Sequence, residues 1–329
     1  MAFSLARTEI DPSDAGLTYV DTGSTGSTGW TRRPCGKGFT YLNERGDTLE
    51  GEQRARAEAL VLPPAWKDVW ICPDPRGHLQ ATGVDEAGRT QYRYHPDWRA
   101  HCEQAKFADM MYFGEALPRL RRRVRDTLNQ PKDHVDLAIA AIIRLLDKGA
   151  IRIGSERSRE GGAFGATTLY KRHVRQTDAD TIRLKFKGKG GKQQDISICD
   201  DGLSRAVAAL QSLPGQSLFD TPDGKVCSSQ VNHFIQETSD GAFTAKDFRT
   251  WGGSVAATRA LRKGADSIKA VSEAAADRLG NTPSIARNSY IHPRIIEMAR
   301  DGRQPDMEDG PVRLLKDERR LFAVLKASD

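Results

Sequence analysis

The hydrophobic pattern of the chain changes near residue 97, and this change limits the folds that are open to it. Residues 31–94 hold short apolar segments separated by tight-turn signals at 74–77 (Asp-Pro-Arg-Gly) and 85–88 (Asp-Glu-Ala-Gly), which is typical of a small antiparallel sheet. From residue 97 onward apolar residues recur at helical spacing, as in the stripe Val135, Ile139, Ile142 and Leu146. We therefore expect an α+β fold.

Three segments are expected: a flexible segment at 1–30, a β-rich N-terminal domain at 31–98, and a larger, mainly α-helical domain at 99–329. In the first domain a helix over 51–60 should pack on the sheet. In the second, helices are predicted over 98–113, 118–128, 132–147 and, near the C-terminus, 312–325. Two strands, 181–186 and 193–198, flank the glycine-rich tip 187–192 and predict a β-hairpin, whereas residues 155–165, rich in glycine and charge, predict a loop.

Composition narrows the class of protein. With 329 residues, 38% of them hydrophobic, the chain is long enough for two domains. No apolar run is long enough for a membrane span and the first residues do not resemble a signal peptide, so we expect a cytoplasmic protein. Five isolated cysteines suggest neither disulfides nor zinc. There is no phosphate-binding loop, dinucleotide-binding motif or metal motif, so no cofactor and no metal are expected.

A formal charge of +6 favours polyanionic partners only weakly, but two basic positions stand in special contexts. Arg152 lies between Ile151 and Ile153 at the end of a predicted core helix. A buried arginine needs an anion, either an internal carboxylate such as Glu156 or Glu160 or an external one. Lys189 lies at the hairpin tip, where a lysine is usually solvated but can also enter a groove when a ligand arrives.

Two further groups of cations lie on predicted helices. Lys246 and Arg249 are one turn apart on the same face, so they repel each other unless they share an anion or lie in water. The densest positive run is a set of five arginines between residues 119 and 125. The default interpretation is a solvated helix face, and the alternative is a surface that follows DNA phosphates.

Residues 89–96 end the predicted sheet with alternating side chains. Strand periodicity places Gln91, Arg93 and His95 on one face and Tyr92 and Tyr94 on the other. One interpretation is two half-buried tyrosines. The other is an edge that presents polar groups to a DNA groove and its phosphates.

The stretch 280–293 carries the candidate nucleophile, Tyr290. Gly280 should end one helix and Pro283 should open a short one. Alone, such a tyrosine is an ordinary packing residue. Its interest comes from Arg152, Lys189 and Arg249 upstream, which are suited to holding or protonating a phosphate.

In their order along the chain, Arg152, Lys189, the Lys246-x-x-Arg249 pair, Asn281 and Tyr290 resemble the type IB DNA topoisomerases, specifically the small bacterial and poxvirus-type branch. The resemblance covers about residues 31–300. It includes the stretches 36–39 (Gly-Lys-Gly-Phe), 63–66 (Pro-Pro-Ala-Trp), 69–73 (Val-Trp-Ile-Cys-Pro), 91–96 (Gln-Tyr-Arg-Tyr-His-Pro) and 167–169 (Thr-Thr-Leu). It implies a catalytic domain of the tyrosine recombinase/type IB topoisomerase type.

The resemblance also implies roles. Tyr290 would attack the scissile phosphate to give a 3′-phosphotyrosyl intermediate, Arg152 and Arg249 would hold its oxygens, and Lys189 would protonate the leaving 5′-oxygen. Asn281, where the commonest family pattern has histidine, would contact an oxygen. Further expected DNA contacts are Arg89, Gln91, Tyr92, Arg93, Tyr94, Arg157 and Lys246.

The implied activity is relaxation of supercoiled duplex DNA without ATP or a required metal, by a monomer associated with the nucleoid. One rival is a site-specific tyrosine recombinase. That family usually has histidine where this chain has Lys246, and its N-terminal domain is helical. The other rival is a non-catalytic clamp that binds DNA through phosphate contacts.

Overall fold

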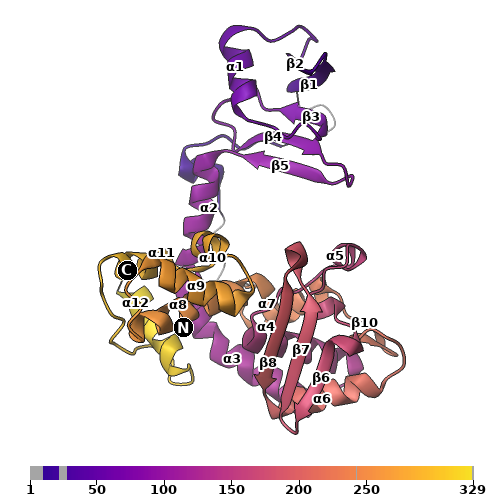
Figure 1. Ribbon diagram of the computed structural model, residues 1–329, viewed down its shortest axis with the longest axis vertical. Coiled ribbons are helices and arrows are strands. Elements are labelled where there is room, and N and C mark those ends of the chain that lie inside the picture. Colours follow the sequence, from indigo (N-terminus) through magenta and orange to yellow (C-terminus); the bar gives the residue numbers. More distant parts are fainter. Residues whose placement is uncertain (1–9, 22–27, 242, 328–329) are drawn as a thin grey trace. The chain divides into compact units, whose positions relative to one another are not determined.

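The computed structural model describes residues 10–21, 28–241 and 243–327. The chain divides into two compact units, of which the first ends at Lys106 and the second begins at Phe107, so the division falls inside helix α2 (Pro96–Ala108). Each unit has its own hydrophobic core. The predicted α+β class is confirmed, with a β-rich first unit and a mainly helical second one (Figure 1).

The N-terminal unit is built on a five-stranded antiparallel sheet of order β2-β1-β3-β4-β5. Its elements are β1 (Trp30–Cys35), β2 (Gly38–Leu42), helix α1 (Gly51–Ala59), β3 (Lys67–Ile71), β4 (Leu79–Val84) and β5 (Thr90–Tyr94), preceded by the single-turn η1 (Pro12–Ala15). Trp30, Leu49 and Ile71 are among the buried residues of the core. The strand periodicity and the turn signals read from the sequence account for this sheet.

The second unit is an assembly of helices around α8 (Ala245–Arg262), which packs against α3, α4, α9, α10 and α12. The helices are α3 (Met110–Asn129), α4 (His134–Gly149), α5 (Glu156–Glu160), α6 (Asp201–Ser212), α7 (Ser228–Thr238), α9 (Ile268–Leu279), α10 (Pro283–Tyr290), α11 (Pro293–Arg300) and α12 (Lys316–Lys326). None of the helices in the described part of the chain is long and apolar enough to cross a membrane.

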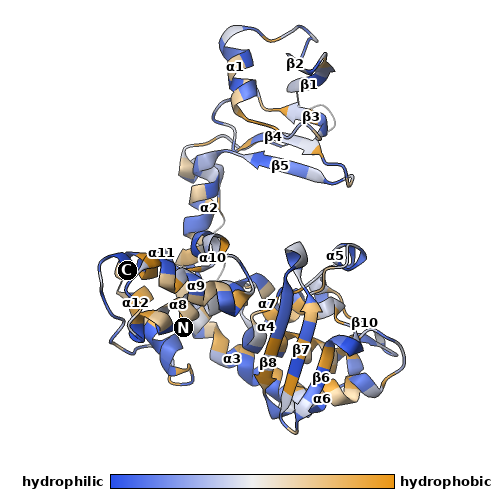
Figure 2. Ribbon diagram, viewed as in Figure 1, coloured by the Kyte–Doolittle hydropathy of each residue, from blue (hydrophilic) through white to orange (hydrophobic). Residues whose placement is uncertain are grey.

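A three-stranded antiparallel sheet of order β6-β7-β8 lies in the same unit. Strands β7 (Thr181–Lys187) and β8 (Gln193–Cys199) form the predicted hairpin, and β6 (Val174–Asp178) adds a third strand that the sequence did not predict. Buried and exposed residues alternate along β7, which gives the alternating blue and orange bands of this strand in Figure 2. The apolar side chains of β7 join the main core.

The hairpin tip is a tight turn. The amide of Gly188 donates to the carbonyl of Lys192 at 2.7 Å, and a short 3-10 turn, η4 (Lys189–Gly191), lies between them. Gly190 and Gly191 have φ values of 73° and 78°, a conformation that favours glycine. The tip therefore requires its glycines, and it exposes Lys189.

Three sequence expectations about this unit are wrong. Pro118 does not open a new helix but lies inside α3, because the buried face of α3, with Leu117, Leu120 and Val124 in the core, outweighs the one hydrogen bond that proline removes. Residues 155–165 are not all loop, since they include α5. The third error, at Arg121, concerns the charged network described below.

Candidate active site

Arg152 follows a sharp turn at the end of α4. Ala150 adopts a left-handed conformation, with φ 50° and ψ 26°, and its amide donates to the carbonyl of Leu146. Two residues later the half-buried Arg152 donates through Nη2 to Oδ1 of Asn281 at 2.7 Å. Glu156, one of the expected internal partners, pairs instead with Arg159 and Lys225. Among the described residues no carboxylate pairs with Arg152, which leaves it able to receive an external anion.

Arg249 lies on α8 and is only 4% exposed. Its Nη1 donates to the carbonyl of Ala150, and its Nη2 donates to the carbonyl of Leu279 at 3.1 Å and to Oδ1 of Asn281 at 3.4 Å. Burial, and next the charge of Arg152, lower the pKa of Arg249 to about 10. It therefore remains a cation at neutral pH, and two close cations favour the binding of an anion.

Asn281 is the point where the two arginines meet. Its side-chain oxygen accepts from both guanidinium groups, which fixes the orientation of the amide because only the oxygen can accept. The amide nitrogen Nδ2 is then left buried without a hydrogen-bond partner in the described part of the chain, as is Nε of Arg249. Unsatisfied buried donors are rare and costly, so these two mark the place in the site where acceptors are missing.

Tyr290 is the last residue of α10, and the guanidinium carbon of Arg249 lies 5.0 Å from the centre of its ring. Burial alone would raise the pKa of the phenol. The charge of Arg249 and its hydrogen bonding, together with the charges of Arg152 and Lys246, outweigh burial and hold the pKa of Tyr290 below its ordinary value. The site therefore stabilises the phenolate, the form that acts as a nucleophile.

Helix α8 also fixes the backbone around Tyr290. The hydroxyl of the fully buried Ser254 donates to the carbonyl of Tyr290 at 3.1 Å and accepts from the amide of His292 at 3.0 Å. Gly253 lies against the same residue, since a Cβ there would come within 2.8 Å of the Tyr290 carbonyl oxygen. This close approach sets the distance between α8 and the end of α10.

Gly253→Ala is expected to slow formation of a covalent Tyr290–DNA adduct by about 10²-fold, because an error of about 1 Å in a reacting group can cost that much. The adduct would be measured in a single turnover at saturating DNA. Gly252→Ala is the matched control, since its Cβ would lie 3.5 Å from Cβ of Ala150 in ordinary contact. Equal rates for the two variants would contradict the positioning by Gly253.

The two candidate lysines are both exposed. Lys189 lies at the hairpin tip, and no hydrogen bond or ion pair of its side chain is present within the described ranges. Lys246 lies one turn before Arg249 on α8, and its charge contributes to the lowered pKa of Tyr290. The structure thus brings Arg152, Arg249 and Asn281 together at Tyr290. Lys246 lies close enough for its charge to lower the pKa of Tyr290. Lys189 lies at the hairpin tip, and its side chain has no fixed partner among the described residues.

Sequence reasoning missed two contacts of the site. Lys192, at the end of the hairpin tip, donates through Nζ to the main-chain carbonyl of Asn281. Arg278, on α9, donates to the carbonyl of Lys148 at 2.7 Å and to that of Asp147 at 3.4 Å. Lys192 lies in a polar tip and Arg278 near the end of an amphipathic helix, so only their position in the fold reveals their partners.

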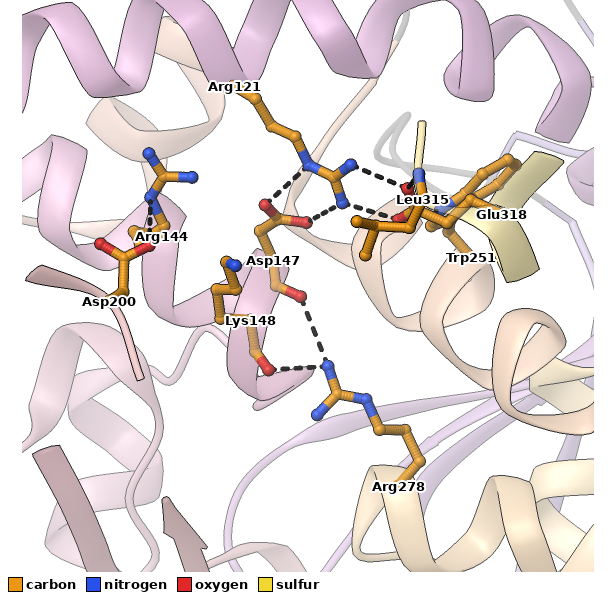
Figure 3. A network of polar contacts seen from close by, with 9 residues as sticks. All are labelled: Arg121, Arg144, Asp147, Lys148, Asp200, Trp251, Arg278, Leu315 and Glu318. Carbon is orange, nitrogen blue, oxygen red and sulfur yellow. Dashed lines mark hydrogen bonds and ion pairs between the residues drawn. The ribbon is translucent and has the colours of Figure 1, made fainter. Parts of the chain in front are cut away.

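A network of charges holds the end of α4 (Figure 3). Arg121 of α3 makes paired hydrogen bonds with Asp147, at 2.7 and 2.9 Å, and with Glu318 of α12, at 2.7 and 2.9 Å. Trp251 donates to Glu318 at 3.2 Å. Burial alone would lower the pKa of Arg121, but the two carboxylates raise it above its ordinary value. The expectation of a solvated arginine face is therefore wrong at Arg121, because this arginine pairs with two buried carboxylates. Both partners lie far away in sequence, so the arginine run gives no sign of them.

Arg121→Met is expected to lower the free energy of unfolding by about 3–5 kcal/mol, the usual cost of leaving buried charges without their partner. The side chains of Asp147 and Glu318 are only 6% and 5% exposed, so water cannot replace the guanidinium. Urea unfolding measures the loss. Arg122→Met, on the exposed face of the same helix, should change stability by less than about 0.5 kcal/mol. Similar values for the two variants would show that the network adds nothing.

Most of the residues that are expected to contact DNA lie on or beside β5. Arg89 and Gln91 both donate to the carboxylate of Asp85, at 2.6 and 2.9 Å. Tyr92 and Tyr94 are 50% and 38% exposed, and their rings stack with centroids 6.0 Å apart. These exposures are those of half-buried side chains, as the first interpretation has it, and the contact of both tyrosines with DNA stays a prediction. Arg93 is exposed on the same strand, and Arg157 is exposed on α5.

Two family models match the chain. The model for the catalytic core of eukaryotic DNA topoisomerase I matches residues 95–290, more than half of the chain. This range contains Arg152, Lys189, Arg249, Asn281 and Tyr290. The model for the N-terminal domain of bacterial DNA topoisomerase IB matches residues 38–85, which contain β2, α1, β3 and β4.

Similarity to individual proteins was found as well. DNA topoisomerase 1B of Acanthamoeba polyphaga mimivirus is 29% identical over 309 residues, which cover 85% of this chain and 92% of the viral protein. Among solved structures, the XerH site-specific recombinase bound to its difH substrate matches with a TM-score of 0.36 and 14% identity over 55% of this chain and 52% of the recombinase. A likeness as slight as the second says nothing about activity. The two family models and the viral relative do bear on activity. They show that this chain belongs to the type IB DNA topoisomerases and is an enzyme that relaxes DNA.

Proposed function

We propose that Tyr290 is the nucleophile with which this topoisomerase cuts one strand of supercoiled duplex DNA, and that Arg152, Arg249, Asn281 and Lys189 assist it. The observation that carries this proposal is the convergence of both arginines on Asn281 beside Tyr290, with two buried donors left unpaired. A phosphodiester supplies the missing acceptors. It also supplies the anion that a pair of neighbouring guanidinium groups, one of them buried, needs.

In the cleavage step the phenolic oxygen of Tyr290 attacks the phosphorus atom. The new bond joins this oxygen to phosphorus, the bond from phosphorus to the 5′-oxygen breaks, and the product is a 3′-phosphotyrosine with a free 5′-hydroxyl strand. Negative charge builds up on the non-bridging oxygens in the transition state. Arg152 and Arg249 stabilise it with donors already in place, and Nδ2 of Asn281 adds a neutral one.

Two protons move in this step, one from the attacking phenol of Tyr290 to water and one to the departing 5′-oxygen. Loss of the first is favoured because the neighbouring cations hold the pKa of Tyr290 below its ordinary value. The 5′-oxygen would otherwise leave as a strongly basic alkoxide, and Lys189 on the hairpin is the proposed general acid. Lys246 supports the charge of the phosphate from α8. Because the phosphotyrosine is itself a phosphodiester, religation reverses these steps without ATP.

The remaining proposals concern the substrate outside the scissile phosphate. Groups on or beside β5, namely Arg89, Gln91, Tyr92, Arg93 and Tyr94, together with Arg157 on α5, are proposed to contact the sugar-phosphate backbone and the grooves. We further propose that the enzyme acts as a monomer, since a single chain holds all the residues assigned to the reaction. Its place would be on the chromosome, in the cytoplasm.

Relaxation of a negatively supercoiled plasmid in EDTA and without ATP tests the proposal directly. Detergent added during the reaction should trap a protein on the 3′ end of one strand, and peptide mapping should find the modification on Tyr290. Relaxation with no adduct at Tyr290 would refute the assignment of the nucleophile. Exchange between two defined sites would favour a recombinase, and binding without any adduct would favour a non-catalytic clamp.

Asn281→His is expected to keep single-turnover cleavage within about tenfold of the unaltered enzyme, because an imidazole can accept from one arginine and donate to the phosphate. Asn281→Leu, which keeps the size but removes the donor and the acceptor, should cost about 10²-fold, as the loss of one transition-state donor does. A suicide oligonucleotide whose cut strand dissociates gives the rate. Complete loss of cleavage in Asn281→His would show that this contact is wrongly assigned.

A further inference from the structure

The hairpin tip makes a specific contact with the active site through Lys192. Its ammonium group donates to the main-chain carbonyl of Asn281, the residue whose side chain receives both Arg152 and Arg249. Exposed lysines at a glycine-rich tip are usually solvated. This one instead joins the tip to the centre of the site.

The closed geometry of the tip links the backbone position of Lys192 to that of Lys189. The bond from the Gly188 amide to the Lys192 carbonyl, at 2.7 Å, closes the tip, so only the three residues of η4, Lys189–Gly191, lie between the paired positions. A second bond, from the Gly191 amide to the Gly188 carbonyl at 3.1 Å, tightens the loop. Fixing Lys192 therefore fixes the backbone of Lys189.

A second contact docks the same edge of the hairpin. Gln194, two residues after Lys192, packs on Gly280, where a Cβ would come within 2.3 Å of its Oε1. Residues two apart in an extended strand project to the same side, so Lys192 and Gln194 both meet the turn formed by Gly280 and Asn281. Gly280 has a φ of 59° and ends α9. The turn thus needs glycine both for its conformation and for the approach of the hairpin.

We propose that Lys192 is a positioning residue, which docks the hairpin tip on Asn281 and so places Lys189 at the leaving 5′-oxygen. The inference rests on the proposed role of Lys189 as general acid. The physical reason is entropy: a tip with three glycines, Gly188, Gly190 and Gly191, samples many conformations unless a side chain anchors it. Lys189 has no such anchor among the described residues, and Lys192 supplies one.

A change of leaving group tests the inference. In a suicide oligonucleotide with sulfur in place of the bridging 5′-oxygen, the leaving thiolate, with a thiol pKa of about 8.5, needs no general acid. Lys189→Met should cleave the oxygen substrate about 10²-fold to 10⁴-fold more slowly and the sulfur substrate at the rate of the unaltered enzyme. Lys192→Met should be about tenfold slower with oxygen and unchanged with sulfur, while Lys192→Arg should retain the rate. The double variant should be no slower than Lys189→Met alone.

Lys187→Met is the matched control, because it removes the same charge from the same hairpin. No contact between Lys187 and Asn281 is present in the described part of the chain. Equal slowing of Lys192→Met on both substrates, an unchanged rate on both, or a loss matched by Lys187→Met would each overturn the inference. If Lys189→Met is not rescued by sulfur, the general acid itself is misassigned, and the proposed function fails at that residue, whatever Lys192 does.

Discussion

Tyr290→Phe is expected to abolish both the covalent adduct and plasmid relaxation, a loss limited only by the sensitivity of the assay. The change removes one oxygen atom, the atom that forms the bond to phosphorus, and no other group can form the same intermediate. The ring remains, and so does its contact with the guanidinium of Arg249, 5.0 Å from the ring centre. Binding of duplex DNA and the melting temperature should therefore stay close to those of the unaltered enzyme.

Tyr112→Phe is a suitable control for this experiment. Tyr112 lies on α3 of the same unit and is 42% exposed, so loss of its hydroxyl should leave both activities intact. The adduct is measured by detergent trapping on a labelled duplex, and relaxation by gel electrophoresis of the plasmid. An adduct that persists in Tyr290→Phe and maps to another residue would remove Tyr290 from the reaction.

The sequence was most informative where a property is local. Strand alternation and turn residues predicted the hairpin that carries Lys189, and the helical stripe of Val135, Ile139, Ile142 and Leu146 predicted α4. Helix-ending and helix-opening signals at Gly280 and Pro283 gave the start of α10 correctly. These elements depend on the conformational preferences of a few neighbouring residues, and those preferences can be read directly from the residue types.

Contacts between distant segments could not be predicted in the same way. The arginine run between residues 119 and 125 looks uniform in sequence, yet Arg121 meets Glu318, almost two hundred residues later, while Arg122 is exposed. Which arginine turns inward depends on the packing of α3 against α4 and α12. Pro118 was misread for a related reason, because tertiary burial of α3 overrides a local preference.

The candidate site combines features that could be predicted from the sequence with contacts that could not. The order of Arg152, Lys189, Arg249, Asn281 and Tyr290 could be read from the chain, and the structure adds that four of them meet. The contacts that hold them, from Ala150, Leu279 and Lys192, could not be read, because two are main-chain carbonyls and the third is a lysine at a solvent-exposed tip. Main-chain partners leave no trace in residue type.

Arg249→Met is expected to slow single-turnover cleavage by about 10³-fold, the upper range for loss of one transition-state donor. The variant also loses the largest charge effect on the nucleophile. The pKa of Tyr290 should therefore rise. If deprotonation of Tyr290 controls the rate, cleavage increases with pH up to that pKa, and the profile of the variant should shift to higher pH. Arg249→Lys keeps a charge but loses the planar fork, so it should recover the pH profile more than the rate.

Arg262→Met, an exposed arginine near the end of the same helix that pairs with Asp317, is the control for loss of a positive charge. Because Arg249 also donates to the carbonyls of Ala150 and Leu279, the melting temperature and the affinity for duplex DNA must be measured for each variant. A slow rate with an unshifted pH profile would mean that Arg249 holds the phosphate without activating Tyr290. An unshifted profile together with a normal rate would show that Arg249 takes no part in cleavage. Because Asn281 is neutral, Arg152 would then be the one assigned arginine that stabilises the transition state.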